Sequence, residues 1–125
     1  MIGGNIINRG RFCKSKHKKS GRFLEVALLC LLKEEASYGY SLMEKLDEFG
    51  FGEDRPNLSI LYRKLNRMED DGMVLSSWKE SKEGPDKKIY EITSKGLEEL
   101  DTWVELIKNR KKRIDSIIEK YESTK

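Results

Sequence analysis

Histidine and cysteine are scarce in this sequence, and their scarcity excludes most catalytic and metal sites. The single histidine is His17, and the two cysteines are Cys13 and Cys30. Cys13 and His17 stand four residues apart, but no second pair of ligands follows at the spacing of a zinc site. No glycine-rich phosphate loop follows a predicted strand, and no nucleophile elbow is present. We therefore expect no enzymatic activity, cofactor or metal in one chain, and only a site shared between two chains stays open.

Long apolar stretches are also absent. The longest run extends over seven residues, from Val26 to Leu32, whereas a helix that spans a bilayer needs about 20. The N-terminus lacks the ordered basic, apolar and cleavage regions of a secretory signal. Two cysteines do not make a disulfide framework, and Cys30 lies inside the apolar run as a small buried hydrophobe would. These absences predict a cytoplasmic protein with no membrane partner.

Acidic residues are missing from the first part of the chain. Residues 1–22 hold seven of the 25 Lys and Arg residues and none of the 22 Asp and Glu residues, a charge of +7. Subtracting them leaves 18 basic and 22 acidic residues in positions 23–125, a net charge of −4. The overall charge of +3 is therefore a weak argument for a nucleic-acid partner. Residues 1–21 also lack hydrophobic periodicity, so we expect a flexible basic tail that either solubilises the chain or contacts phosphates.

Hydrophobic spacing predicts three helices between residues 22 and 71. Residues 23–32 are apolar on nearly every side, which is typical of a helix buried on more than one side. A second helix is expected to start at an N-cap on Ser37 and to end at Gly50. Its inward residues are expected to be Tyr40, Met43, Leu46 and Phe49. A third helix is expected from an N-cap on Asn57 to about Asp71. Its core face is expected to contain Leu58, Leu61, Leu65 and Met68.

The second half of the chain predicts a hairpin followed by one long helix. Residues 73–78 and 89–93 have strand character, and the polar segment between them, which contains Gly84 and Pro85, forms the tip. The long helix then begins at a cap on Thr93 or Ser94 and continues to about residue 123. At 1.5 Å per residue it is a rod of roughly 40 Å, which is longer than the body of so small a domain.

This last helix carries an apolar seam at heptad spacing, which only Lys111 interrupts. A seam that extends beyond the domain needs a partner, and a second copy of the chain is the usual one. The alternative is that the helix folds back and buries the seam within its own subunit. The residues expected at a homodimer interface are Phe23, Val26, Leu100, Trp103, Val104, Ile107, Ile114 and Ile118.

Three helices, a hairpin and a long helix, in this order, are the plan of a winged helix-turn-helix. We therefore predict a mainly α fold with a small β-hairpin, in which residues 22–93 form a DNA-binding domain and residues 94–123 a C-terminal dimerisation helix. In this fold the third helix enters the major groove, where Arg suits guanine and Asn suits adenine. The third helix offers Asn57, Ser59, Ile60, Arg63, Asn66 and Arg67 to double-stranded DNA, and the hairpin offers Lys82, Lys87 and Lys88.

One alternative function stays open. A winged helix can serve as a protein-interaction module that does not bind DNA, and the net charge of −4 on residues 23–125 favours this alternative. The salt dependence of duplex binding separates the two functions, because phosphate contacts give a steep negative slope.

Three segments resemble the PadR family of transcriptional regulators. They are YGYSL (38–42), ILYRKLNRMEDDGMV (60–74) and KKIYEITSKG (87–96). The resemblance covers about residues 22–121 and is to the smaller subclass, which has a short C-terminal helix. It implies a homodimeric repressor that binds palindromic promoter sites and dimerises through its first and last helices. It also implies that Tyr62 contacts the DNA backbone.

Some members of this family release DNA when a small aromatic or drug-like ligand binds between the last helices. The aromatic residues available for such an effector here are Trp103 and Phe23. The sequence departs from the family at two places. Ile60 stands where a small or hydroxyl residue is frequent, which favours contact with a thymine methyl. Lys87 and Lys88 stand where Arg pairs are common, and an ammonium is less selective in geometry than a guanidinium.

Overall fold

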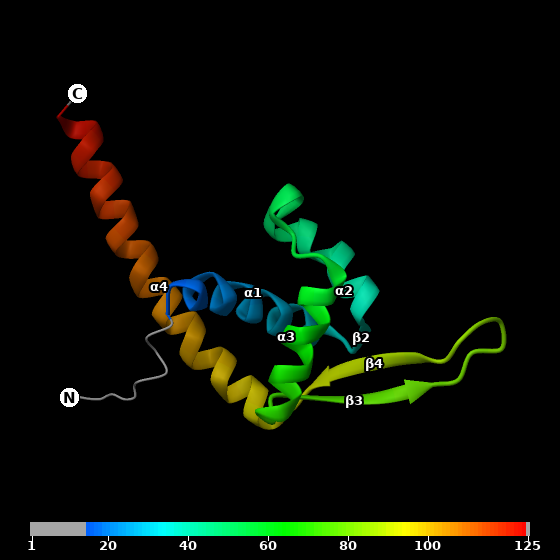
Figure 1. Cartoon of the computed structure of the whole chain (residues 1–125). Helices are drawn as coiled ribbons and strands as arrows, with labels where there is room; N and C mark the ends of the chain where they lie inside the picture. Colours follow the sequence, from blue (N-terminus) through cyan, green and yellow to red (C-terminus); the bar gives the residue numbers. More distant parts are fainter. Residues whose placement is uncertain (1–14, 125) are drawn as a thin grey trace.

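The computed structural model describes the backbone of residues 15–124 and the side chains of residues 22–124. The elements are α1 (Ser15–Glu34), β2 (Ser37–Tyr38), α2 (Gly39–Lys45), η2 (Leu46–Phe49), η3 (Gly52–Asp54), α3 (Leu58–Asp70), β3 (Val74–Lys79), β4 (Lys87–Ile92) and α4 (Ser94–Ser123). Figure 1 shows α1, α2 and α3 gathered in one body, from which the β3–β4 hairpin and the distal part of α4 project in different directions. The predicted fold, a mainly helical winged helix-turn-helix, is confirmed.

α1 is the central helix of the core. Leu28 and Leu29 are neighbours in the sequence and both are fully buried, which requires other elements on two sides of the helix. α1 contacts α2, β4 and α4. The other fully buried side chains are Leu31, Leu42, Leu46, Leu61, Leu65, Met68, Val74 and Tyr90. Each buried aliphatic side chain contributes about 1.5–3 kcal/mol of hydrophobic stabilisation. The helix is therefore buried on more than one side, as predicted, but Phe23 at the start of the apolar run is 57% exposed and Cys30, predicted to be buried, is only partly buried.

α1 begins eight residues earlier than the apolar run that predicted it, at Ser15 rather than Phe23. The predicted tail boundary at residue 21 is therefore wrong for residues 15–21. The cause is that a helix with a buried segment as its nucleus extends at little cost through Lys-rich residues that show no hydrophobic period. The rest of the predicted tail, residues 1–14, lies outside the described residues.

The second helix differs from its prediction at its start and in its inner face. Ser37 is not a cap but part of β2, where it pairs with Tyr90. Met43 is buried as expected, whereas Tyr40 is 60% exposed and Phe49 is 46% exposed. From Leu46 onward the helix tightens into the 3-10 turn η2, which rotates each residue further than an α-helix does and turns Phe49 away from the core. The segment ends as predicted at Gly50, whose φ of 79° lies in the left-handed region.

The sheet is antiparallel with the strand order β2-β4-β3. Val74 pairs with Ile92, Ser76 with Tyr90 and Trp78 with Lys88. Because side chains alternate along a strand, these pairs share one face of the hairpin, and the pairs between them lie on the other face. Both strands of the hairpin lie where the sequence predicted them, to within two residues. The two-residue strand β2 was not predicted, because so short a segment shows no period.

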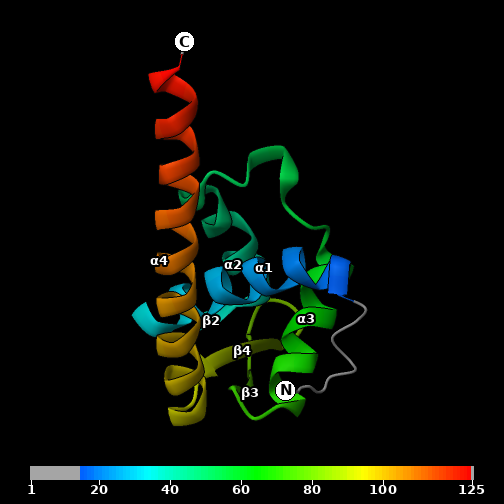
Figure 2. The same cartoon turned by 90° about the vertical axis from the view of Figure 1, so that its left-hand side faces the viewer.

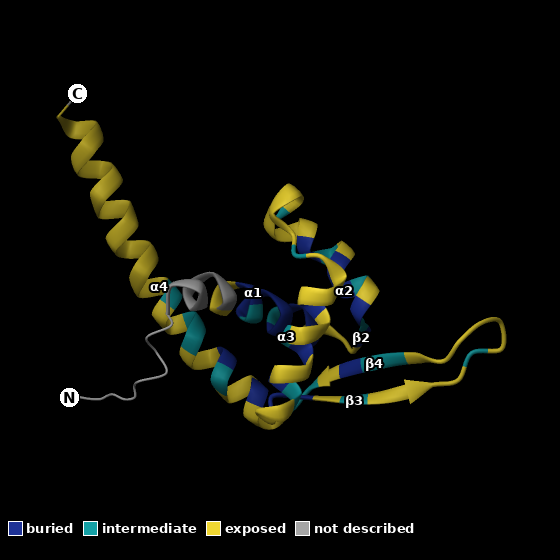
Figure 3. Ribbon diagram, in the orientation of Figure 1, coloured by how far each residue is buried: buried dark blue, intermediate teal, exposed yellow. Residues whose placement is uncertain are grey.

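α4 contains 30 residues, which corresponds to about 45 Å. Its N-terminal half packs against α1. From Lys108 onward every described residue of the helix is exposed, and Figure 3 shows this half uniformly in the colour of exposed residues. Figure 2, in which α4 stands upright, shows its C-terminal end extending past the body.

The end of α3 is joined to the start of α4 by side chains of the first turn of α4 and its cap. Thr93 caps α4 as predicted, because its Oγ1 accepts a hydrogen bond from the Gly96 amide at 3.0 Å. The same hydroxyl donates to the carbonyl of Gly72 at 2.6 Å. Lys95 Nζ donates to the carbonyl of Asp71 at 2.8 Å. The orientation of α3 is thereby fixed relative to α4.

Candidate nucleic-acid interface

α3 presents to solvent the polar face that the sequence predicted. Ser59, Arg63, Asn66 and Arg67 are exposed. The core side of the same helix is buried as predicted at Leu61, Leu65 and Met68, whereas Leu58 is 40% exposed. Ile60 and Tyr62 flank the polar face at 37% and 36% exposure. Guanidinium and amide groups side by side on one helix face match the hydrogen-bonding edges of base pairs in the major groove.

Asn57 holds the N-terminus of α3. Its Oδ1 accepts a hydrogen bond from the Ile60 amide at 2.9 Å, so the predicted N-cap is confirmed. This bond uses the side-chain oxygen and leaves the amide NH2 group as a donor. Asn57 and Ser59 are both exposed beside the first turn of the helix, where backbone N–H groups are oriented toward solvent.

Tyr62 lies where α2 and α3 approach each other. A Cβ atom added to Gly39 would be 2.5 Å from Cε1 of the Tyr62 ring and 2.6 Å from its hydroxyl oxygen. Glycine at position 39 therefore makes room for the ring, which explains why Gly39 stands at the buried start of α2. The ring remains partly exposed on the side of α3 that faces α2, next to the polar face.

Lys64 anchors α3 to α1 and is not part of the polar face. Its Nζ lies 3.7 Å from the carboxylate of Glu25, and the Glu25 side chain is only 15% exposed. Burial raises the pKa of Glu25 above its usual value, and the nearby charges of Lys64 and Arg22 oppose this effect only in part.

This buried carboxyl gives a testable pH dependence. A pKa raised by folding means that the folded chain binds the proton more tightly than the unfolded chain, so stability from this group is present at low pH and is lost as pH rises through the raised pKa. We expect Glu25→Gln to unfold at pH 8 with a free energy up to about 1 kcal/mol above the parent, and the gain to disappear near pH 4. Urea unfolding at both pH values measures this. A variant less stable than the parent at pH 8 would show that the ion pair with Lys64 outweighs desolvation.

The three hairpin lysines do not form one group. Lys88 Nζ lies over the rings of Trp78, at 5.8 Å, and Tyr90, at 5.6 Å. Lys87 lies on the opposite face of the hairpin, over the ring of Tyr38 at 5.7 Å. Lys82 is exposed at the tip. The segment 79–88 also contains three acidic residues beside its four lysines, so any contact with DNA depends on single lysines and not on a uniform positive charge.

The hairpin is fixed to α3 by a hydrogen bond between side chains. Ser76 Oγ donates to the carboxylate of Glu69 at 2.8 Å, which joins β3 to the last turn of α3. The face of the hairpin that carries Ser76 is therefore the face turned toward α3.

The apolar seam of α4 divides into two parts. Val26 and Leu100, both expected at a dimer interface, are 6% and 3% exposed within the single chain, so these two predictions are wrong. Their side chains fill the subunit core, and a periodic seam does not reveal which positions its own subunit covers. The half-buried residues packed against the core are Trp103, Val104 and Ile107. The exposed apolar residues beyond them are Ile114, Ile117, Ile118 and Tyr121.

The two aromatic residues expected at an effector site have different neighbours. The guanidinium of Arg22 lies 5.4 Å from the centre of the half-buried Trp103 ring. Phe23 is 57% exposed, and its ring centre is 6.0 Å from that of Phe51. Trp103 therefore has a cation on its face, and Phe23 belongs to a pair of aromatic rings that includes the loop before α3.

Residues 28–102, more than half of the chain, match the transcriptional regulator PadR-like family. The chain belongs to the PadR-like family. Over 79 residues it is 35% identical to a Mycobacterium tuberculosis protein named "Probable transcriptional regulator Rv1176c", an alignment that covers 62% of this chain and 41% of that protein. The PadR-like chain thus spans about two fifths of the length of this curated relative. The family resemblance predicted from the three sequence segments is confirmed.

Solved structures of PadR proteins share the fold of this PadR-like chain. A PadR-like transcription factor from Bacteroides fragilis superposes with a TM-score of 0.72 and 27% identity, covering 83% of this chain and 98% of the other. PadR of Bacillus subtilis, whose structure contains operator DNA, superposes with a TM-score of 0.60 and 26% identity, covering 66% and 47%.

Membership in this family makes the chain a transcriptional regulator and not an enzyme.

Among residues 22–124, no His, Cys, Asp and Glu side chains gather in the groups of three that could hold a metal ion. Cys13 and the side chain of His17 lie outside the described residues. No described helix has an apolar stretch long enough to cross a membrane. The family match ends at residue 102, so the distal half of α4 lies beyond it.

One exposed aromatic residue near this interface was not among the predicted site residues. Trp78 in β3 is 66% exposed and has Lys88 beside it. Strand alternation places it on the same face as Ser76. The sequence contains this alternation, but only the contact between Ser76 and Glu69 shows which face of the hairpin is turned toward α3.

Proposed function

We propose that this PadR-like regulator is a sequence-specific DNA-binding repressor that acts as a homodimer on palindromic operators. The observation that carries the proposal is the exposed polar face of α3, with Arg63, Asn66 and Arg67, held at a fixed position beside the hairpin by the bond between Glu69 and Ser76. The operator complex of Bacillus subtilis PadR, a structure of the same fold, supports it.

Each predicted site residue has a role in this proposal. Arg63, Asn66 and Arg67 meet base edges in the major groove, and Ile60 meets a thymine methyl. Phosphates are contacted by Asn57, Ser59 and Tyr62 at the start of α3. The DNA backbone beside this groove is contacted by the hairpin residues Lys82, Lys87 and Lys88.

The homodimer is proposed to form through α4. The distal half of α4 is exposed along its whole length and carries Ile114 and Ile118, each 49% exposed, in line with the half-buried Ile107. A second α4 covers such a seam, and two-fold symmetry of the protein suits an inverted repeat in the DNA. In this proposal residues 22–93 bind DNA and α4 forms the dimer. The simplest mode of regulation for such a protein is to occupy a promoter, which represses transcription.

An effector is proposed to act at Trp103. A small aromatic ligand would stack on this ring in place of the Arg22 guanidinium. Phe23, which follows Arg22 in α1, is the second aromatic residue proposed for the effector site. The ligand switches DNA affinity only if it prefers one arrangement of the two α4 helices over another. Because a regulator of this kind binds chromosomal DNA, we also propose that it is located in the cytoplasm.

The experiment that tests the function measures binding to the DNA upstream of the regulator's own gene at two salt concentrations. An unrelated duplex of equal length serves as the control. Selective binding that weakens steeply with salt is the expected result, because each neutralised phosphate releases counterions. Weak binding without preference at either salt concentration would contradict the proposal and favour a protein-interaction module.

Arg63→Ala is expected to weaken operator binding by about 1–3 kcal/mol and to relax the base preference at one position of each half-site. Arg113→Ala is the matched control, because it removes the same charge from an exposed position of distal α4. Fluorescence anisotropy with duplexes that vary one base pair at a time measures both effects. Unchanged affinity and preference in the Arg63 variant would remove this residue from the interface.

A further inference from the structure

We infer that Trp78 is a DNA-contacting residue, and that its indole ring packs against the deoxyribose edge of the minor groove beside the major groove that α3 occupies. This inference rests on the proposed function and adds to it an aromatic contact next to the cationic ones. The partner that covers the exposed ring is duplex DNA.

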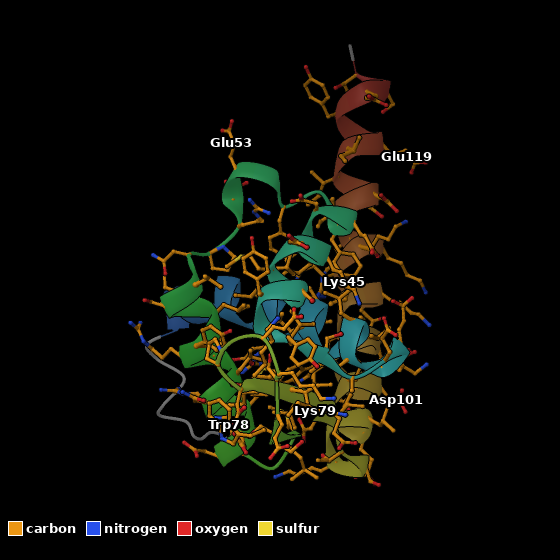
Figure 4. The ribbon with its side chains drawn as sticks, turned by 90° about the vertical axis from the view of Figure 1, so that its right-hand side faces the viewer. Lys45, Glu53, Trp78, Lys79, Asp101 and Glu119 are labelled. Atoms are coloured by element: carbon orange, nitrogen blue, oxygen red, sulfur yellow. The ribbon has the colours of Figure 1, made fainter. Side chains whose placement is uncertain are left out.

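The register of the hairpin turns Trp78 toward α3. Val74, Ser76 and Trp78 alternate onto one face of β3, where Val74 is buried and Ser76 donates its hydrogen bond to Glu69 of α3. Trp78 is two residues further along the strand, about 7 Å beyond that bond. Figure 4 shows Trp78 on the side of the hairpin nearer to α3 and Lys79 on the side nearer to α4.

The chemistry around the ring suits a sugar–phosphate backbone. The indole is 66% exposed, and the Lys88 ammonium lies 5.8 Å from its centre. An ammonium neutralises a phosphate, whereas the adjacent ring covers the apolar C–H groups of the sugar next to it. Contact with the sugar buries apolar surface of the indole ring that is exposed to water in the free protein, and this burial favours binding.

The place of the ring relative to α3 selects the minor groove. If the polar face of α3 occupies the major groove, a hairpin fixed beside α3 lies over the flanking backbone and the adjacent minor groove. Apolar side chains are known contacts in that groove, where they pack against sugars or between base steps. Lys82 at the tip and Lys88 beside the ring then have phosphates on either side of the groove within reach.

The test uses the full chain and a duplex enriched from a random-sequence library by the parent protein. Trp103→Phe leaves Trp78 as the single tryptophan, since the chain has two. Because Trp103 belongs to the proposed dimer seam, fluorescence anisotropy of the labelled duplex first verifies that this variant still binds. We expect the emission of Trp78 to be quenched when this duplex is added. Trp78→Ala should bind about tenfold more weakly, with the same salt slope as the parent, because the lost contact carries no charge. Trp78→Phe should recover most of the affinity.

Two further variants identify the kind of contact. Leu75→Ala removes an apolar side chain of similar exposure, 56%, from the opposite face of the same strand, and it should bind like the parent. Lys88→Ala should lower both the affinity and the salt slope, the latter by about one.

Each outcome decides the matter. Quenching of Trp78 together with weaker binding by Trp78→Ala, but not by Leu75→Ala, supports the inference. An enriched duplex that leaves Trp78 emission unchanged, or that Trp78→Ala binds within twofold of the parent, overturns it while the proposed function stands. Equal losses in the Trp78 and Leu75 variants overturn it as well, because they would reflect a general weakening of the hairpin. Failure to enrich any duplex overturns the proposed function and this inference with it.

Discussion

Replacing Ile114 and Ile118 with glutamate is expected to convert the proposed dimer of this PadR-like chain into monomers and to weaken operator binding by a factor of about 10²–10⁴. Both isoleucines are 49% exposed in the single chain, so their charged replacements are tolerated by the isolated helix. In a dimer the same positions face a second helix, and four unpaired carboxylates would have to leave water together. Loss of the dimer also removes the joint binding of two half-sites, which is the source of the large factor.

Sedimentation velocity measures the oligomeric state, and circular dichroism confirms that α4 stays helical. Ile107 is unsuited to this test, because it packs against the core of its own subunit and a charge there would also destabilise the monomer. The matched control is Asn109→Glu with Ser116→Glu, which adds the same two negative charges to the same part of α4 but on the face opposite the seam. An intact dimer in the isoleucine variant would refute α4 pairing and point to a different interface.

Gly96→Ala is expected to lower the free energy of unfolding by about 3 kcal/mol, although alanine is the better helix former. Gly96 is buried in the first turn of α4. A Cβ atom at this position would collide with the carbonyl oxygen of Met73 and would lie 2.7 Å from Cγ1 of Ile92. The Met73 carbonyl also accepts a hydrogen bond from the Thr93 amide, so the collision can be relieved only if the first turn of α4 moves.

Two further variants serve as comparisons for the expected loss of stability in Gly96→Ala. Ser94→Ala changes an exposed residue two positions away and should alter stability by less than about 0.5 kcal/mol. Gly39→Ala should have a smaller effect than Gly96→Ala, because the group in its way is the end of the Tyr62 side chain, which can rotate. Urea unfolding at one fixed protein concentration is the measurement, since the proposed dimerisation would make stability depend on concentration. If Gly96→Ala were as stable as the parent, the close packing of α4 on the α3–β3 turn would be disproved.

Long segments with a strong period could be predicted from the sequence, and short or polar ones could not. The core side of α3, its Asn57 cap, the hairpin and the Thr93 cap of α4 all follow from local patterns that the structure confirms. The first two turns of α1 carry no hydrophobic signal, because they extend from a buried segment that lies further along the chain. The strand β2 exists only through its pairing with β4, a contact between distant residues.

The candidate site shows the same division between local and distant information. Helical spacing is sufficient to place Arg63, Asn66 and Arg67 on one exposed face. The sequence predicted the second strand only from Ile89, so it did not show that Lys87 and Lys88 lie in β4 and therefore on opposite faces. It also does not show that Trp78 lies on the α3 side, because that depends on how the sheet packs. The burial of Val26 and Leu100 within one subunit likewise depends on tertiary contacts that a heptad pattern does not contain.

The hydrogen bonds from Thr93 and Lys95 to the carbonyls of Gly72 and Asp71, directly after α3, hold α3 and the first turn of α4 together as one unit. If two chains pair near Ile114, the arm from that point back to Thr93 is about 30 Å long. A change of ten degrees in the angle at which the two arms cross would shift the two α3 helices relative to each other by about 5 Å. Successive major grooves on one side of DNA recur about every 34 Å, so a shift of this size is enough to take one α3 out of register with its groove. The side chains that set this crossing angle therefore determine which spacing between operator half-sites the dimer accepts, although they lie far from the DNA.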